Sequence, residues 1–274
     1  MGFLKLPGIF SDIGIGYLIY KIALFLKSPK PLLTATLYLL NPAVIYISSV
    51  WGQIESVTNF FLLYSLYLSL VPEKQNIKLL SLPVFCLAVL IKQTAFWFTP
   101  FYLLLWIKEI DWQGIVKGFI TSIVIFFGSY LSIGLHPVAA VKSYFSTLSG
   151  SSTTVADAAW NVWYFLFPNL PSDSQKIGLI SIRQLSIILL SLVLIFLIVR
   201  LIKKYSIGRL LSYLFVWSLV VFFLQTRVHE RHLAPALMFC LLTPRLFTRF
   251  LLDFIILSAY HMYNLYWSLR LPFI

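Results

Sequence analysis

The stretch Asn41-Pro-Ala-Val-Ile-Tyr-Ile-Ser-Ser-Val-Trp51-Gly-Gln53-Ile-Glu55-Ser-Val-Thr-Asn59 decides how the rest of the chain is interpreted. It follows one apolar run and opens the next, so it lies where a membrane helix turns back. Trp51 and Glu55 are four residues apart and can share one helical face. An interfacial Trp and an acid at a helix N-terminus are the structural alternative. An acid and an amide at a membrane rim are costly without a function, so the cluster predicts a polar site.

The composition places the chain among membrane proteins. Of its 274 residues, 60% are hydrophobic and only 11% are charged, and the mean hydropathy is +0.90. A soluble domain needs far more polar surface, so this class is excluded. The formal net charge of +12 is then interpreted as a signal of membrane topology, and no nucleic-acid partner is expected.

Apolar runs of about spanning length divide the whole chain. They lie near residues 9–26, 32–50, 56–71, 77–91, 94–107, 115–135, 178–200, 208–225, 232–247 and 250–267. The pattern predicts an all-α, polytopic transmembrane helical bundle of about ten spans, forming a single domain over residues 1–274. One long connection, residues 136–176, is rich in Ser, Thr and Trp, and we expect it to carry short interfacial helices.

Lys and Arg residues sort the connections into two sides. The loops that are denser in these residues are predicted to face the cytoplasm, which places both chain ends outside. The protein is therefore expected to be a multi-pass membrane protein. All the unusual polar clusters then fall on the outer side and predict one outward-facing polar cavity: Lys5 with Asp12, Trp51 to Glu55, Lys92 with Gln93, Asp157 to Trp163, and Arg227 to His232.

Each cluster has a structural alternative that the sequence leaves open. Asp12 lies about a turn inside the first helix and suits either a cap or a polar site. Lys92 either extends to the headgroups or binds a phosphate as a mobile charge. The aromatic and amide residues after Asp157 suit sugar stacking but are also common at interfaces.

The richest cluster is Gln225-Thr-Arg227-Val-His229-Glu230-Arg231-His232. Two Arg and two His residues at one helix mouth make an anion site, because a guanidinium matches phosphate oxygens with a planar fork. Glu230 alternatively serves only to neutralise the two arginines. Pro235 opens the next run and allows an irregular helix near the site.

The ordered set of motifs resembles the GT-C superfamily of multi-spanning glycosyltransferases, especially its bacterial and archaeal mannosyltransferase-like members. The resemblance covers nearly the whole chain and is carried by these motifs: Asn41-Pro42, Trp51-Gly52-Gln53 with an acid at Glu55, Lys92-Gln93, Trp160-Asn161-Val-Trp163, and His229-Glu230-Arg231. It implies transfer of a hexose, with inversion, from a polyprenyl-phosphate sugar donor outside the cytoplasm. The implied acceptor is a lipid, a glycan or a protein.

The chain departs from the family pattern at two points. Glu55 stands where the family usually has Asp, so the carboxylate reaches one methylene further. The chain also begins at a segment, Lys5-Leu-Pro7, that resembles the stretch following the family's first helix and catalytic outer loop. We therefore expect that helix and loop, with their catalytic acid, to be missing.

The roles implied by the resemblance and by residue chemistry complete the hypothesis. Asp12 or Glu55 would be the catalytic base, and the leaving phosphate would be held by Lys92, Arg227, His229 and Arg231. The sugars would be bound by Lys5, Trp51, Gln53, Gln93, Asn161, Trp163 and Glu230. No metal site and no cofactor beyond the lipid-linked donor are expected. A transporter or flippase of lipid-linked sugars, and an inactive chain of the same family, remain as alternatives.

Overall fold

A computed structural model describes residues 2–148, 152–243 and 246–269 of the chain. The structure is 76% helix and 4% strand, which confirms the all-α fold class. Each of the predicted apolar runs contains at least one helix. The helical pattern follows from runs of Leu, Ile and Phe that are interrupted mainly at Pro, Gly and charged residues.

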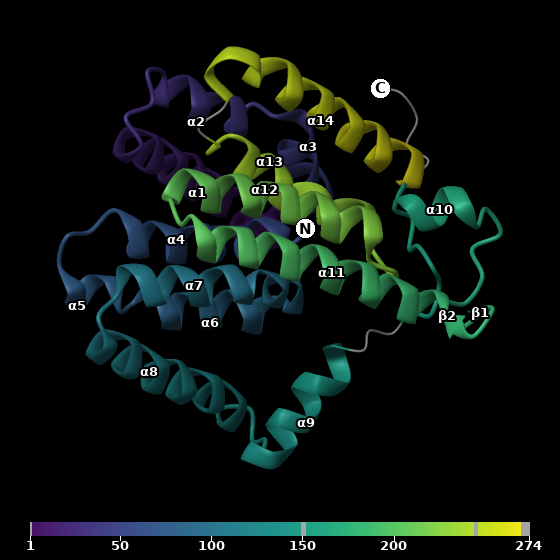
Figure 1. Cartoon of the computed structure of the whole chain (residues 1–274), viewed down its shortest axis with the longest axis horizontal. Helices are drawn as coiled ribbons and strands as arrows, with labels where there is room; N and C mark the ends of the chain where they lie inside the picture. The colour runs from purple at the N-terminus through teal and green to yellow at the C-terminus, as the bar shows by residue number, and fades with distance from the viewer. Residues whose placement is uncertain (1, 149–151, 244–245, 270–274) are drawn as a thin grey trace. The chain divides into compact units, whose positions relative to one another are not determined.

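The chain forms two compact units, and Figure 1 labels their helices and strands. Unit 1 comprises Met1–Leu39 and Ile47–Ser151, and unit 2 comprises Leu40–Tyr46 and Ser152–Ile274. The elements of unit 1 are η1 (Gly2–Lys5), α1 (Leu6–Phe25), α2 (Pro31–Leu39), η2 (Tyr46–Trp51, entering from unit 2), α4 (Glu55–Leu70), α5 (Gln75–Lys78), α6 (Ser81–Ile91), η3 (Gln93–Phe98), α7 (Thr99–Glu109), α8 (Trp112–Leu131) and α9 (Pro137–Leu148). Those of unit 2 are α3 (Pro42–Ile45), α10 (Val162–Leu166), β1 (Lys176–Ile177), β2 (Ile180–Ser181), α11 (Ile182–Lys203), α12 (Ile207–Leu224), η4 (Glu230–Leu233), α13 (Ala234–Cys240) and α14 (Leu246–Leu269).

In unit 1, α4 packs between α1 and α6. Small hydroxyl residues allow α4 and α6 to approach closely and bond to each other: the Ser65 and Ser69 hydroxyls both contact Ser81 Oγ, at 2.9 and 2.7 Å. The Trp106 indole N–H of α7 donates to the same Ser81 oxygen at 2.8 Å. One buried serine cluster therefore joins three helices without leaving polar groups unsatisfied.

Gly118 makes a close contact possible between α8 and the start of α6. A Cβ at this position would lie 2.7 Å from the backbone oxygen of Leu79, whereas a Cβ at Gly128 of the same helix meets nothing within 4 Å. We expect Gly118→Ala to destabilise the protein and Gly128→Ala to be neutral or stabilising, because Ala favours a helix by about 1 kcal/mol over Gly. Thermal unfolding of the two variants in one detergent tests this, and equal midpoints would contradict the close packing.

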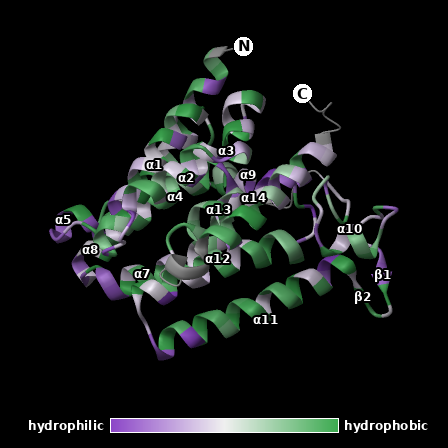
Figure 2. Ribbon diagram, turned by 90° about the horizontal axis from the view of Figure 1, so that it is seen from above, coloured by the Kyte–Doolittle hydropathy of each residue, from purple (hydrophilic) through white to green (hydrophobic). Residues whose placement is uncertain are grey.

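In unit 2, α11 and α12 form a helical hairpin that packs on α13 and its neighbours. Ser181 caps α11 by accepting from the Gln184 N–H, while the Gln184 side chain accepts from the Ser181 N–H, so the helix begins sharply after β2. The surface of α11 is hydrophobic along most of its length (Figure 2). Most of α13 is fully buried and, with Trp217 and Phe222 of α12, forms the core.

Within the part of the chain that the structure describes, four helices are long and apolar enough to cross a membrane: Phe3–Phe25, Trp112–Leu131, Ile182–Lys203 and Ile207–Leu224. The bent pair Pro31–Leu39 and Pro42–Trp51 would make a fifth. These helices support a membrane protein, while the count of about ten spans stays a prediction. Four of the predicted runs form shorter helices: α4 has 16 residues, α6 and α7 have 11 each, and α13 has 7. A helix of 11 residues rises only about 16 Å, which is less than the roughly 30 Å of a bilayer's hydrocarbon core.

Two short helices, α9 and α10, lie in the predicted long connection, and α9 belongs to unit 1 while α10 belongs to unit 2. The single domain over residues 1–274 stays a prediction. In the structure, the chain folds into two compact units.

Candidate functional site

The predicted polar stretch of unit 1 is irregular where it leaves η2. This element is a π-helix. π-Helices are rare in proteins overall, and those that occur are often found at functional sites. The Gln53 N–H donates to the Ile47 oxygen at 2.9 Å and closes the turn, in which Gly52 has a φ of +79°. The stem of Lys5 covers Gly52, and Lys5 Nζ donates to the Val50 oxygen at 2.8 Å. Trp51 and Gln53 remain partly exposed.

A second helix break meets the first one through an ion pair. Glu55 is the first residue of α4. Lys92 has an extended conformation between α6 and η3, and Gln93 is the first residue of η3. The Lys92 ammonium is paired with the Glu55 carboxylate. Lys5, Gln53, Glu55 and Lys92 therefore belong to three interrupted helix ends of the same unit. Irregular backbone in a membrane protein is tolerated where it lies inside protein or lines a cavity.

The two predicted catalytic carboxylates of unit 1 are both enclosed. Asp12 is 7% exposed, and its Oδ1 accepts from the Tyr38 hydroxyl at 3.0 Å. The hydroxyls of Ser48 and Ser56 also stabilise the charged form of this carboxylate by hydrogen bonding. Glu55 is 5% exposed. A sugar hydroxyl could therefore reach either base only after the surrounding side chains had moved.

An apolar crevice of about 280 Å³ lies between α6, α7 and α8 of unit 1. Val89, Phe96 and Thr99 line it near the Lys92 helix break, and Trp106, Ile107 and Ile115 line it further along. Its walls are almost entirely apolar, and α8 is a candidate span with few buried residues. The crevice therefore suits a hydrocarbon chain better than a polar ligand.

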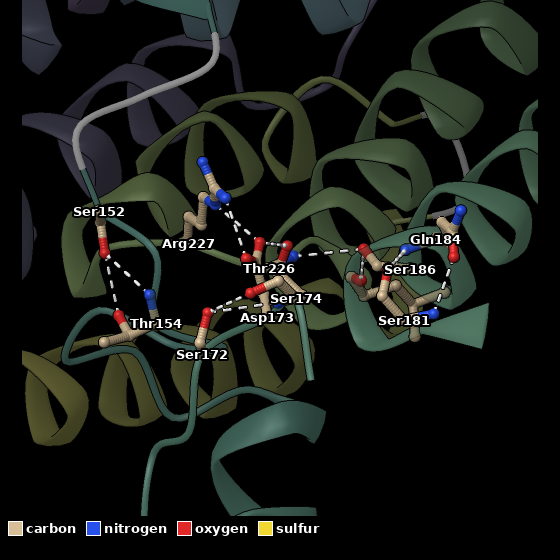
Figure 3. Close-up of polar contacts among 11 residues, drawn as sticks. Ser152, Thr154, Ser172, Asp173, Ser174, Ser181, Gln184, Ser186, Thr226 and Arg227 are labelled. Carbon is tan, nitrogen blue, oxygen red and sulfur yellow. Dashed lines mark hydrogen bonds and ion pairs between the residues drawn. The ribbon is translucent and has the colours of Figure 1, made fainter. Parts of the chain in front are cut away.

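In unit 2, the segment after α12 is held by a buried ion pair. Arg227 Nε and Nη2 donate to the two oxygens of Asp173 at 2.6 and 2.9 Å, and the Thr226 hydroxyl adds a bond of 3.2 Å (Figure 3). The bonds to Asp173 raise the pKa of Arg227 above its usual value. Arg227 has a φ of +62°, a left-handed conformation that is strained for a residue other than Gly.

This pairing gives Arg227 a structural task. One edge of its guanidinium, Nε with Nη2, is occupied by a carboxylate that is fully buried. The predicted binding of a donor phosphate by that edge would require Asp173 to leave. We therefore assign Arg227 to holding the segment, and this differs from the role predicted from the sequence.

Two predicted sugar-binding residues are also part of the internal framework. Asn161 is 0% exposed: its side chain caps α10 through the Tyr164 N–H and donates to the Gln225 oxygen at 3.1 Å. Trp163 is 2% exposed and donates its indole N–H to the Leu224 oxygen at 2.7 Å. Both side chains fasten α10 to the end of α12, so they would position other groups and would not contact a sugar themselves.

Three charged or titratable side chains of unit 2 are partly exposed near η4: Asp157, His229 and Arg231. His229 Nε2 lies 3.3 Å from Asp157 Oδ2, and Arg231 Nη1 donates to Glu230 Oε1 at 2.9 Å. The Glu230 side chain is nearly buried, whereas the Arg231 guanidinium keeps a partly exposed face. The structure thus brings the predicted cluster of residues 157–163 and the cluster of residues 227–232 together at one end of the α11–α12 hairpin.

Helix α14 contributes polar residues that the sequence analysis did not select. Asn264 accepts from the Trp160 N–H at 2.8 Å and donates to the Glu230 oxygen at 3.0 Å. The hydroxyls of Tyr260 and Ser268 contact the backbone oxygens of Trp160 and Ala158. The signal was present as polar residues recurring about every three or four positions along an apolar run: Ser258, His261, Asn264 and Ser268.

No family model matches the chain, and a search of curated proteins finds no match. Among the described residues no group of three or more His, Cys, Asp and Glu side chains is placed to hold a metal ion.

Proposed function

We propose that the protein is a membrane glycosyltransferase that moves a hexose from a polyprenyl-phosphate donor to an acceptor hydroxyl on the extracytoplasmic side. The observation that carries this proposal is the apolar crevice of unit 1, which runs along α7 from the helix break that holds Lys92. A hydrocarbon chain fits the crevice, and the helix break between the lining residues Val89 and Phe96 contains Lys92, which is paired with Glu55. That combination suits a lipid with an anionic head group.

The polar residues of unit 2 support the same class of reaction. The segment between α12 and η4 departs from helical geometry at the end of a candidate span, and the buried side chains of Asn161, Asp173 and Asn264 hold it and the start of η4 in place. Such a framework is costly to build, and here it presents Asp157 and Arg231 at the surface of the unit. Arg231 is suited to stabilise negative charge on a leaving phosphate.

The proposed step conserves its atoms and charges. The acceptor oxygen forms a bond to the anomeric carbon, and the bond from that carbon to the phosphate oxygen breaks. The phosphate keeps the electron pair, and a carboxylate takes the acceptor proton. About ten spans, a GT-C-like arrangement, a mannose-like sugar and a prokaryotic plasma membrane belong to this proposal.

The test uses the purified protein in lipid nanodiscs with radiolabelled hexosyl polyprenyl phosphates and a panel of lipid, glycan and peptide acceptors. We expect a labelled glycoside together with free polyprenyl phosphate. A flippase would release no polyprenyl phosphate, so the same assay separates the two functions. Absence of transfer from every donor tested would contradict the proposal.

Arg231→Ala should lower turnover much more than it lowers the yield of folded protein, because charge stabilisation in the transition state is lost while most of the fold is kept. Arg183→Ala is the matched control, since Arg183 is exposed at the first turn of α11 in the same unit. Equal losses of turnover and of folded yield in the Arg231 variant would indicate a structural ion pair with Glu230.

A further inference from the structure

The proposed transfer requires a base that an acceptor hydroxyl can reach, and the chain offers nine carboxylates, all within the described residues. Four of them lie in or beside the Lys- and Arg-rich connections predicted to be cytoplasmic: Glu73, Glu109, Asp111 and Asp253. The remaining five belong to the predicted outer side. Burial and bonding distinguish these five from one another.

Four of the five outer carboxylates are enclosed and engaged in internal contacts. Asp173 is fully buried in its two-point pair with Arg227, and Glu230 is nearly buried beside Arg231. Glu55 is paired with Lys92, and Asp12 accepts from Tyr38. All four are 7% exposed or less, so an acceptor hydroxyl could reach them only after the surrounding residues had moved.

Asp157 differs from these four because its side chain is 35% exposed while its backbone is fixed. The Asp157 N–H donates to the Val228 oxygen at 3.0 Å, and the next residue, Ala158, has a φ of +63°. The Ser268 hydroxyl of α14 contacts the Ala158 oxygen. A strained backbone that several elements hold in place is a feature of sites that require exact positioning.

His229 orients this carboxylate. The His229 side chain accepts from the backbone N–H of His232. We assign this acceptor to Nδ1, which places the ring proton on Nε2. Nε2 points to Asp157 Oδ2 at 3.3 Å. One carboxylate oxygen is thereby held by the imidazole, and Oδ1 is left to accept from a hydroxyl group that arrives from outside.

We propose that Asp157 is the general base of the transfer reaction, with His229 as its positioning residue. This inference rests on the proposed function. Asp157 takes the proton of the acceptor hydroxyl as the oxygen bonds to the anomeric carbon and the phosphate leaves with its electron pair. It replaces Asp12 and Glu55, which the sequence suggested for this role.

The first test compares Asp157→Asn with Asp157→Glu in the nanodisc assay. Asn keeps an oxygen that accepts from His229 but cannot accept a proton, so we expect kcat to fall about 100-fold or more, with the donor KM within about twofold of wild type. Glu should recover a measurable part of the rate. Asp253→Asn, the same change at an exposed position of α14, should leave kcat unchanged.

The possible outcomes separate the two proposals. An active wild type with an Asp157→Asn variant that keeps more than about one tenth of the rate would overturn the base assignment alone. A wild type without transfer would overturn the proposed function, and the base assignment with it. His229→Gln should lower kcat less than Asp157→Asn does, and the double variant should be no slower than Asp157→Asn, because the two residues act as one unit.

A second test needs no substrate. Carbodiimide with a water-soluble amine, followed by peptide mass spectrometry, should label Asp157 readily and leave Asp173 and Glu230 protected. Labelling of all three to the same extent would overturn the accessibility argument, whatever the activity of the variants.

Discussion

Replacing Asp173 by Ala is expected to destabilise the protein by about 1.5–3 kcal/mol, because the change removes the charge-assisted hydrogen bonds that hold the partly exposed Arg227. Asp173 is fully buried, and Arg227 is held by it through two bonds in a left-handed conformation. Without the carboxylate, little would hold this strained backbone. The midpoint of thermal unfolding in detergent, followed by size-exclusion chromatography of heated samples, measures the loss.

A neighbouring substitution and a double variant make this prediction specific. Gln175→Ala changes an exposed side chain two residues away and should leave the midpoint unchanged. Asp173→Leu combined with Arg227→Met should be more stable than either single variant, because neither charge is then buried alone. A double variant that is as unstable as the sum of the singles would show that the pair itself contributes little.

Replacing Asn264 by Leu is expected to be the second large effect on stability. The side chain is 0% exposed and bonds both the Trp160 N–H and the Glu230 oxygen. Leu has a similar size but satisfies neither group, and each unsatisfied buried group costs about 1–3 kcal/mol. Hydrogen exchange should rise at Trp160 in particular, because its N–H loses its acceptor.

Ser258→Ala on the same helix is the control for Asn264→Leu. Ser258 accepts from the Asn41 side chain at 2.6 Å, far along the helix from Asn264, so exchange at Trp160 should stay slow in this variant. Unchanged exchange at Trp160 in the Asn264 variant would contradict the proposed coupling of α14 to the loop before α10.

Much of the fold was predictable from local sequence because helices depend on short-range patterns. The apolar runs, the Ser181 and Gln184 cap and the breaks at Gly52 and Lys92 are all visible in the sequence, and each corresponds to a feature of the structure. The site clusters were visible for a similar reason, since a charge inside an apolar chain is rare enough to be noticed. The number of spans could not be predicted from local sequence, because the length of an apolar run does not determine the length of the helix that forms within it.

Composition and hydrophobic periodicity were enough to identify an all-α membrane protein and the polar segments that interrupt its helices. The role of each polar side chain, in contrast, depends on its contacts in the folded protein. Arg227 and Asp157 are both charged residues of the predicted polar clusters, yet one is fixed by Asp173 and the other is partly exposed beside His229. The physical reason is that accessibility and partner choice depend on residues about 50 to 100 positions away, such as Asp173 and Asn264, and no local pattern encodes those contacts.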